Sequence, residues 1–365
     1  MITQDHRLRA PVIIGLRPDA SPQDCVLDAP VDVNVDVKVE ANVEANVAAP
    51  TEREPLLTGT ADQATLTVDR QELKLTHLNK VFYPKEGYTK RDLLNYYDAV
   101  ADLLLPHLKD RPLSLRRYPN GIEKEAFFQK RADKGFPEWA RTELIAEKQG
   151  DEPRPMAICN DRATLLYLTH LGCIDENPWM SRVGALDLPD FLLIDLDPYK
   201  CAYGKIVEAA QLVRSKLNQV GLASYPKTTG GDGMHLYVPL EPIYTYEQTR
   251  TFAEIIARIV TAERTDLFTT PRAVEKRQPG KVYFDYLQIG RGKTISAPYV
   301  LRAYPGAPVA TPLEWDEVKE GLLPSQFHLR NAIDRFSQTG DLFEPVLNNR
   351  QRLEPAMKKL ESLVR

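Results

Sequence analysis

Two aspartates one residue apart, Asp195 and Asp197, close an apolar run in the segment PDFLLIDLDP (189–198). If this run forms a buried strand, residues i and i+2 point to the same face, so both carboxylates leave the sheet together. Adjacent carboxylates repel each other unless a cation lies between them, and hard divalent ions prefer such oxygen ligands. The pattern therefore indicates metal-assisted phosphoryl transfer. A turn that binds no metal is the alternative, because D-x-D pairs are common in turns.

A third carboxylate, Asp285, lies in a second strand-like segment, KVYFDYLQ (281–288). Strand alternation places Asp285 on one face among apolar neighbours. A carboxylate is costly to bury there unless it is paired or bound to a metal ion. A salt bridge to an arginine is one solution. The other is that Asp285 joins Asp195 and Asp197 in a three-carboxylate metal cluster.

A glycine-rich segment, KTTGGDGMHLYVP (227–239), lies between these two strands. Glycines let backbone N–H groups approach phosphate oxygens, and the hydroxyl of Thr229 adds a donor. His235, in the short strand that follows, can donate to a phosphate. An ordinary hairpin would look the same, so the segment alone predicts only a candidate phosphate loop.

The segment QIGRGKTISAPYVLR (288–302) carries three cations, Arg291, Lys293 and Arg302. Guanidinium and ammonium groups can gather around a polyphosphate. Ordinary surface charge after a strand is the alternative.

A basic and aromatic stretch spans residues 111–131. Its cations are Arg111, Arg116, Arg117, Lys124, Lys130 and Arg131, and its aromatic residues are Tyr118, Phe127 and Phe128. Cations interleaved with aromatic rings suit a single strand or a frayed nucleic-acid end. The net charge of −4 argues mildly against nucleic acid, and a solvated surface over core aromatics is the alternative.

The elements that would position these residues are a mixture of helices and strands. Thr89 and Asp92 resemble a capping box that opens an amphipathic helix. Further helices are predicted at 206–220 and 252–260, and strands at 191–196, 235–238 and 282–287. Because the strands and helices do not alternate strictly, we expect an α+β domain, or two subdomains around a cleft.

The composition is typical of a soluble globular chain, with 365 residues of which 43% are hydrophobic and 27% charged. No run approaches the ~18 apolar residues of a membrane helix. The start of the chain also lacks the pattern of a signal peptide, which favours cytoplasmic residence. The four cysteines have no zinc-ligand spacing, and we expect reduced thiols at Cys25, Cys159, Cys173 and Cys201.

Residues 1–72 differ from the rest of the chain. The stretch VDVNVDVKVEANVEANVAAP (31–50) uses few residue types and repeats A-N-V. Alternating valines could form an edge strand, but large apolar companions are missing and acidic residues recur. We therefore expect a disordered or extended segment up to residue 72 and folded structure from about Leu73.

Taken in order, these segments resemble the polymerase domain of bacterial DNA ligase D, a member of the archaeo-eukaryotic primase superfamily. The resemblance covers roughly residues 73–345, and the segments that carry it are 77–97, 111–130, 161–182, 189–198, 225–239 and 284–309. It implies an archaeo-eukaryotic primase-like α+β core of two mixed subdomains around a central cleft. Residues 346–365 would then form a helical C-terminal tail.

The resemblance also implies residue roles and partners. The catalytic metal ligands would be Asp195, Asp197 and Asp285, holding two divalent ions, Mn²⁺ or Mg²⁺. The residues that contact the incoming rNTP or dNTP would be Thr229, His235, Lys293 and Arg302. The DNA contacts would be Lys80 and Lys90 on a downstream 5′-phosphate, with Arg116, Arg117, Phe127 and Phe128 on the template. Ribonucleotides would be preferred, and the end-binding protein Ku and a separate DNA ligase would act beside the polymerase in end joining.

Some positions depart from the family pattern. Asp232 stands where many relatives carry lysine, Ile289 replaces a common asparagine, and ENPW (176–179) replaces a histidine-containing version. The sequence holds no K-x-D-G ligase motif, so we expect a stand-alone polymerase. A two-metal nuclease or phosphoesterase, and a non-catalytic DNA-end-binding module, are the competing hypotheses.

Overall fold

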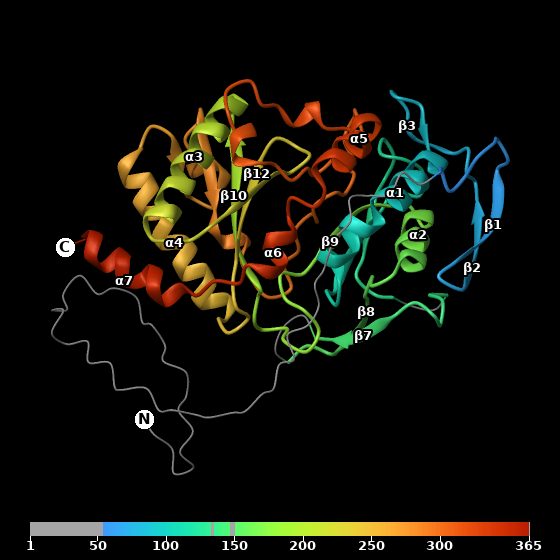
Figure 1. Ribbon diagram of the computed structural model, residues 1–365, viewed down its shortest axis with the longest axis horizontal. Coiled ribbons are helices and arrows are strands. Elements are labelled where there is room, and N and C mark those ends of the chain that lie inside the picture. Colours follow the sequence, from blue (N-terminus) through green and yellow to red (C-terminus); the bar gives the residue numbers. More distant parts are fainter. Residues whose placement is uncertain (1–53, 133–134, 147–149, 365) are drawn as a thin grey trace, which may run out of the picture. The chain divides into compact units, whose positions relative to one another are not determined.

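The computed structural model describes residues 54–132, 135–146 and 150–364 (Figure 1). Helices and strands are mixed along this part of the chain, so the predicted α+β class is confirmed. Its buried hydrophobic side chains form two large clusters. One surrounds a five-stranded sheet, and the other surrounds helices α1 (Lys90–Leu108) and α2 (Arg162–His170).

The five-stranded sheet has the order β11-β12-β10-β14-β13, which places β10 at its centre. Its strands are β10 (Phe191–Tyr199), β11 (Tyr225–Thr228), β12 (Met234–Pro239), β13 (Phe268–Thr269) and β14 (Lys281–Asp285). All neighbours are antiparallel except β13 and β14, which run parallel. The three predicted strands are therefore present. The last of them ends early, at Asp285, because a 3-10 turn follows over Tyr286–Gln288.

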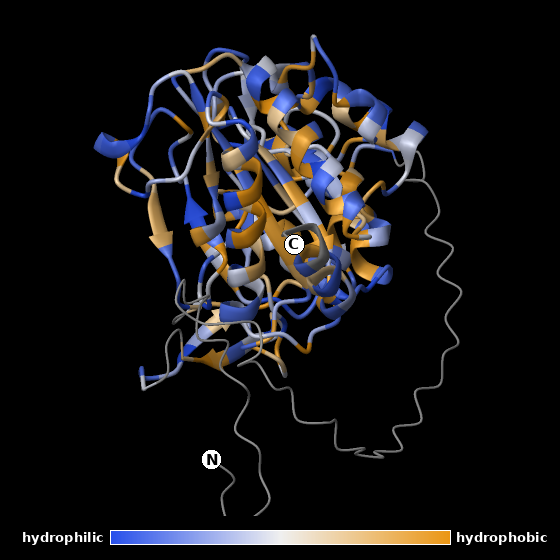
Figure 2. Ribbon diagram, turned by 90° about the vertical axis from the view of Figure 1, so that its left-hand side faces the viewer, coloured by the Kyte–Doolittle hydropathy of each residue, from blue (hydrophilic) through white to orange (hydrophobic). Residues whose placement is uncertain are grey.

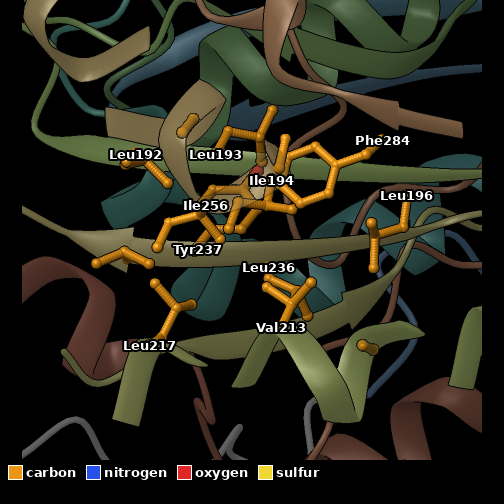
Figure 3. Close-up of a cluster of buried hydrophobic side chains, with 14 of the residues drawn as sticks. Leu192, Leu193, Ile194, Leu196, Val213, Leu217, Leu236, Tyr237, Ile256 and Phe284 are labelled. Carbon is orange, nitrogen blue, oxygen red and sulfur yellow. The ribbon is translucent and has the colours of Figure 1, made fainter. Parts of the chain in front are cut away.

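Helices α3 (Tyr203–Gln219) and α4 (Tyr246–Glu263) contact β10 and each other, so they cover the same face of this sheet. Figure 3 shows the buried cluster between them, including Leu192, Ile194, Leu196, Val213, Leu217 and Ile256. Because side chains alternate along a strand, Asp195 and Asp197 leave β10 on the face away from these leucines. Helix α4 begins before the predicted 252 because Thr245 and Gln248 form a capping box.

The second cluster packs α1 and α2 against a three-stranded sheet of order β6-β5-β9. These strands are β5 (Leu113–Arg117), β6 (Phe127–Gln129) and β9 (Cys173–Pro178). The predicted capping box of α1 is confirmed, because the Thr89 hydroxyl accepts from the Asp92 N–H while the Asp92 carboxylate accepts from the Thr89 N–H. Three cysteines in the described part are free thiols, as expected: Cys159, Cys173 and Cys201.

Three two-stranded hairpins complete the strand structure. They are β1 (Gln63–Val68) with β2 (Gln71–Thr76), β3 (Val81–Tyr83) with β4 (Tyr88–Thr89), and β7 (Thr142–Ile145) with β8 (Arg154–Ala157). The first hairpin corrects the expected start of folded structure at Leu73, because β1 precedes it and Val68 is buried. The turn between β1 and β2 is made by Asp69 and Arg70 at positive φ without glycine, so the usual hairpin signal is missing from the sequence. Residues 1–53, which include the valine-rich stretch and Cys25, lie outside the described part.

The C-terminal part contains α5 (Leu329–Thr339), α6 (Glu344–Asn348) and α7 (Leu353–Val364). Leu353, Ala356 and Leu360 on α7 are buried in the cluster around the five-stranded sheet. A helix therefore occupies most of the predicted 346–365 tail, and it packs against the core. In Figure 2 apolar residues gather where helices cover strands. None of the helices within the described ranges is both long and apolar enough to cross a membrane.

Candidate functional site

Strand register brings the predicted carboxylates together. Asp195 on β10 lies directly opposite Asp285 on β14, and on its other side it lies opposite His235 on β12. His235 in turn lies opposite Lys227 on β11. Cross-strand partners share a face of the sheet, and Asp197 shares it as residue i+2. The ladder therefore sets one row of side chains across four strands: Lys227, His235, Asp195 and Asp285.

Asp195 is nearly buried, with 9% of its surface exposed. Burial, followed by the charge of Asp285, raises the pKa of Asp195 to about 7. Burial and the charges of Asp195 and Asp285 likewise raise the pKa of Asp197 to about 7. Both shifts reflect the burial of the carboxylates and their mutual repulsion, which nearby cationic side chains offset only in part.

The oxygens of these carboxylates fit a metal ion. Oδ1 of Asp195 and Oδ1 of Asp285 are buried, and neither has a hydrogen-bond partner among the described residues. His235 Nε2 lies 3.4 Å from Asp195 Oδ1, too loose to satisfy that oxygen fully. Within the described ranges, no group of three or more His, Cys, Asp or Glu side chains is placed so that it could hold a metal ion as it stands, so the three aspartates do not form a ready-made metal site. The donor chemistry suits a hard divalent ion, which would supply the missing partner.

His235 is buried and its pKa is lowered well below the usual value, first by burial and then by the charges of Lys227 and Arg302. The imidazole is therefore neutral at physiological pH, and it can donate one N–H. Its Nδ1 has no hydrogen-bond partner in the described part of the chain. This leaves a polar atom beside Asp195 that a ligand can use.

The glycine-rich loop (229–233) packs directly on the carboxylates. A Cβ atom on Gly233 would lie 2.7 Å from the backbone oxygen of Leu196 and 2.8 Å from Oδ1 of Asp197. Only glycine permits that approach. The hydroxyl of Thr229 accepts from the backbone N–H groups of Gly231 and Gly233, both at 3.1 Å. The Thr229 hydroxyl thus shapes the loop. Sequence analysis expected this hydroxyl to contact the nucleotide.

Arg302 lies over this loop. Its Nη1 donates to the backbone oxygen of Thr229 at 2.5 Å and to Oγ of Ser296 at 3.1 Å. Gly230, at a φ of +69°, leaves room for it, because a Cβ there would lie 2.5 Å from Cγ of Arg302. The structure therefore joins Arg302 to the glycine-rich loop, whereas its predicted contact with the nucleotide stays a prediction.

Lys293 lies close enough to Asp285 for their charges to interact, whereas Arg291 pairs elsewhere. Burial lowers the pKa of Lys293 and the charge of Asp285 opposes that shift, so the two groups are electrostatic neighbours. The ammonium of Lys293 donates to the backbone oxygen of Leu287. Arg291 instead pairs with Asp187 at 2.6 Å, which corrects the expectation that it gathers around a polyphosphate.

Lys227 is a site residue that sequence reasoning missed. Its side chain is fully buried, and its Nζ donates to the Thr228 backbone oxygen at 3.3 Å and to Oγ of Ser296 at 3.4 Å. Burial, and then the charge of Arg302, hold the pKa of Lys227 well below its usual value. A local signal was available in the sequence, because Lys227 lies on the strand just before the glycine-rich loop. Its pairing with His235, however, depends on strand register.

Lys80 and Lys90 lie near each other at the start of α1. Burial and the charge of Lys80 lower the pKa of Lys90 to about 8. Lys90 Nζ donates to the backbone oxygen of Thr76 at 3.1 Å, and Lys80 Nζ donates to that of Pro119 at 3.0 Å. Two neighbouring ammonium groups held by neutral oxygens form a positively charged lysine pair suited to an anion.

Arg116, Arg117, Phe127 and Phe128 form two cation–ring pairs on β5 and β6, one on each face because side chains alternate along a strand, and the two pairs are together called the arginine–phenylalanine platform. Arg116 lies opposite Phe128, and Arg117 lies opposite Phe127. The guanidinium of Arg116 is 5.5 Å from the Phe128 ring, and that of Arg117 is 5.2 Å from the Phe127 ring. Phe127 is 44% exposed and Phe128 65% exposed, so aromatic faces backed by cations are presented to solvent. The predicted pairing of cations and aromatic rings is therefore present.

Comparison with solved structures identifies the class. The fold matches the polymerase domain from Mycobacterium tuberculosis ligase D, solved in complex with DNA, with a TM-score of 0.70 and 29% sequence identity. The match covers 76% of this chain and 99% of that one. Fold and site together therefore define a polymerase-type nucleotidyltransferase.

Residues 89–343 match the family described as LigD, primase-polymerase domain, and the chain belongs to this family. It is 36% identical over 282 residues to the bifunctional non-homologous end joining protein LigD of Bacillus subtilis, a match covering 77% of this chain and 45% of that protein. It is 33% identical over 285 residues to the multifunctional LigD of Mycolicibacterium smegmatis, covering 76% of this chain and 36% of that protein. The resemblance seen in the sequence is confirmed. The chain spans less than half the length of these relatives, and the expected stand-alone status stays a prediction.

Proposed function

We propose that this protein adds nucleotides, ribonucleotides in preference, to a primer 3′-hydroxyl at DNA ends. It would fill gaps or overhangs during double-strand break repair by end joining. One observation carries the proposal: strand register sets Asp195 and Asp285 side by side, the glycine-rich loop closely approaches Asp197 on the same strand as Asp195, and Arg302 donates to that loop.

Asp195, Asp197 and Asp285 would hold two divalent ions, Mn²⁺ or Mg²⁺. When bound, such ions lower the pKa of the primer hydroxyl and neutralise charge on the triphosphate and the leaving pyrophosphate. The buried carboxylate oxygens without partners support this assignment. Their raised pKa values are compatible with it, because a bound cation would favour the charged carboxylates and so oppose the effects of burial and repulsion.

The chain's own residues would bind and orient the triphosphate. Arg302 and Lys293 supply positive charge on two sides of the carboxylates. Neutral His235 supplies an N–H donor, and burial keeps it from adding a charge. Donors fixed in a partly buried site act more strongly than they would in water. Thr229 contributes by holding the loop backbone in place.

The DNA would be held at two places. The Lys80 and Lys90 pair would bind the 5′-phosphate of the downstream strand, because a terminal phosphate carries more charge than an internal one. The arginine–phenylalanine platform would stack on template bases. That the similar polymerase domain was solved with DNA supports this assignment. Ku and a separate DNA ligase would be the partners, at the nucleoid in the cytoplasm.

Primer extension on a gapped duplex tests the proposal. The downstream strand of the gap carries a 5′-phosphate, and rNTP and dNTP are compared with Mn²⁺ and with Mg²⁺. The expected product is the primer extended by one or a few nucleotides, more efficiently with rNTP. Degradation of the primer without extension would favour a two-metal nuclease. DNA binding without either reaction would favour an end-binding module.

A further inference from the structure

Asp175 on β9 is a buried carboxylate that lies against Arg302. Its Oδ2 is 3.3 Å from Nε of Arg302, and the two side chains are only 4% and 16% exposed. A charge pair removed from water to this degree is screened little by salt. The pair therefore ties the second sheet to the candidate nucleotide site.

The other side of the Arg302 guanidinium is fixed by neutral oxygens. Its Nη1 donates to the Thr229 backbone oxygen and to Oγ of Ser296. The same Ser296 Oγ lies 3.4 Å from Nζ of Lys227. Two cationic groups thus meet at one hydroxyl, and they repel each other. Asp175 lies against a different atom of the guanidinium group, Nε, at 3.3 Å.

The Asp175 and Arg302 side chains lie close together, but some of their polar atoms have no hydrogen-bond partner. Arg302 Nε and Asp175 Oδ1 are both buried, and neither has a hydrogen-bond partner among the described residues. The attraction is therefore mainly that of opposite charges held together in a low-dielectric setting. It offsets the repulsion between Lys227 and Arg302 and holds the guanidinium over the glycine-rich loop.

We infer that Asp175 is a positioning residue of the nucleotide site, which holds Arg302 in place to contact the triphosphate. The inference rests on the proposed function, because it assumes that Arg302 meets nucleotide. Arginine has a long flexible side chain, and a fixed guanidinium loses less entropy when it binds a phosphate. Without Asp175, the guanidinium would turn away from Lys227.

Nucleotide titration of an Asp175→Asn variant tests the inference. The apparent KM for rNTP should rise about tenfold, as expected when a charge-assisted contact is lost, while kcat changes little. Asp175→Glu, which keeps the charge, should restore part of the affinity. The matched control is Glu176→Gln, which replaces the next acid on β9; that residue is buried beside Tyr96 and Tyr97 and away from Arg302.

The decisive comparison repeats Asp175→Asn in an Arg302→Ala background. If Asp175 acts through Arg302, the second substitution should add no further loss of nucleotide affinity, because coupled residues are non-additive. An equal loss in both backgrounds, or a similar loss from Glu176→Gln, would overturn the inference in favour of a structural role. If Arg302→Ala alone leaves the apparent KM unchanged, the proposed triphosphate contact itself fails. If Arg302→Ala weakens nucleotide binding and Asp175→Asn does not, only the inferred role of Asp175 is wrong.

Discussion

At the scale of single residues, the site combines charges that are costly to hold close together. Asp195 faces Asp285 across the ladder, while Lys227 and Arg302 meet at Ser296. Burial magnifies both repulsions, as the raised pKa values of Asp195 and Asp197 and the lowered pKa of Lys227 show. A protein that only needed stability would replace such groups with apolar ones. The proposed binding of metal ions and a polyphosphate would account for their presence.

Nucleotide affinity should depend on the donors over the carboxylates. His235→Ala, Lys293→Ala and Arg302→Ala should each weaken rNTP binding about 5–30-fold, because each removes a charged or buried hydrogen-bond donor. DNA affinity should change little. Titration of nucleotide into each variant measures this effect. Arg291→Ala is the control from the same segment, since Arg291 pairs with Asp187. Unchanged affinity in all three variants would move the triphosphate elsewhere.

At the scale of elements, the chemistry depends on how closely the glycine-rich loop approaches β10. Sequence analysis identified the strand around Asp195 and the glycine-rich segment, because both have local signals. It did not reveal that Gly233 contacts Asp197, or that Lys227 shares a row with Asp195. Those facts depend on strand register and on packing between segments far apart in the chain. The role of Thr229 shows the same limit of sequence analysis, because its hydroxyl accepts a hydrogen bond from the backbone of its own loop.

Gly233→Ala should disrupt the site. The added Cβ would lie 2.7 Å from the Leu196 backbone oxygen and 2.8 Å from the Asp197 carboxylate, so the loop or the strand must move. We expect a loss of about 1–3 kcal/mol in stability and a large loss of nucleotide addition. Thermal unfolding and primer extension measure the two effects. Gly231→Ala is the control, because its nearest neighbour would be a side-chain atom of Tyr304 at 3.4 Å. Equal activity of both variants would show that the close approach is unimportant.

A buried ion pair connects α1 to β10. Arg111, just after α1, donates two hydrogen bonds to Asp190, just before β10, at 2.6 and 2.8 Å. Burial opposes ionisation of Asp190, but Arg111 and Arg182 outweigh it and lower the pKa of that carboxyl. Asp190→Asn should therefore cost about 3–5 kcal/mol at neutral pH, because it leaves Arg111 buried without its partner charge.

The pH dependence of this loss has a definite sign. Because the folded-state pKa of Asp190 lies below the unfolded value of about 3.9, its contribution is complete above that pH. It is lost as pH falls through the lower folded value. Denaturant unfolding of wild type and Asp190→Asn should therefore converge only in acid. Asp266→Asn, in an exposed pair with Arg264, should change stability little at any pH. A constant difference down to strongly acidic pH would contradict the assignment.

At the scale of the whole molecule, two clusters of buried side chains support two different surfaces. The cluster around β10 carries the carboxylate site, and the cluster around α1 carries the lysine pair and the arginine–phenylalanine platform. The α+β class was predictable from mixed helix and strand signals. The start of folded structure was not, because the β1–β2 turn lacks glycine and the preceding valine-rich stretch masks the change in composition. The family resemblance identified the motifs by their order along the chain, and the structure added the contacts between them.

Recognition of a DNA end should depend on Lys80 and Lys90. Wild type should bind gapped DNA about 5–30-fold more tightly with a downstream 5′-phosphate than without it, as expected for one or two phosphate contacts. Lys80→Ala/Lys90→Ala should lose this preference and keep weak, salt-sensitive binding. Lys74→Ala is the control, because Lys74 is exposed and pairs with Glu72. Equal binding of both DNA forms by wild type at moderate salt would contradict end recognition.

The central claim is that Asp195 and Asp197 carry out nucleotidyl transfer, and the most direct test is single-turnover primer extension by Asp195→Ala and Asp197→Ala. Each variant should lose nucleotide addition by about a thousandfold or more, which corresponds to about 4 kcal/mol of transition-state stabilisation. DNA binding and thermal stability should be retained, because each change removes a carboxylate from a mutually repelling set. If either variant extends the primer at a rate near that of wild type, the carboxylate site is not the centre of the reaction.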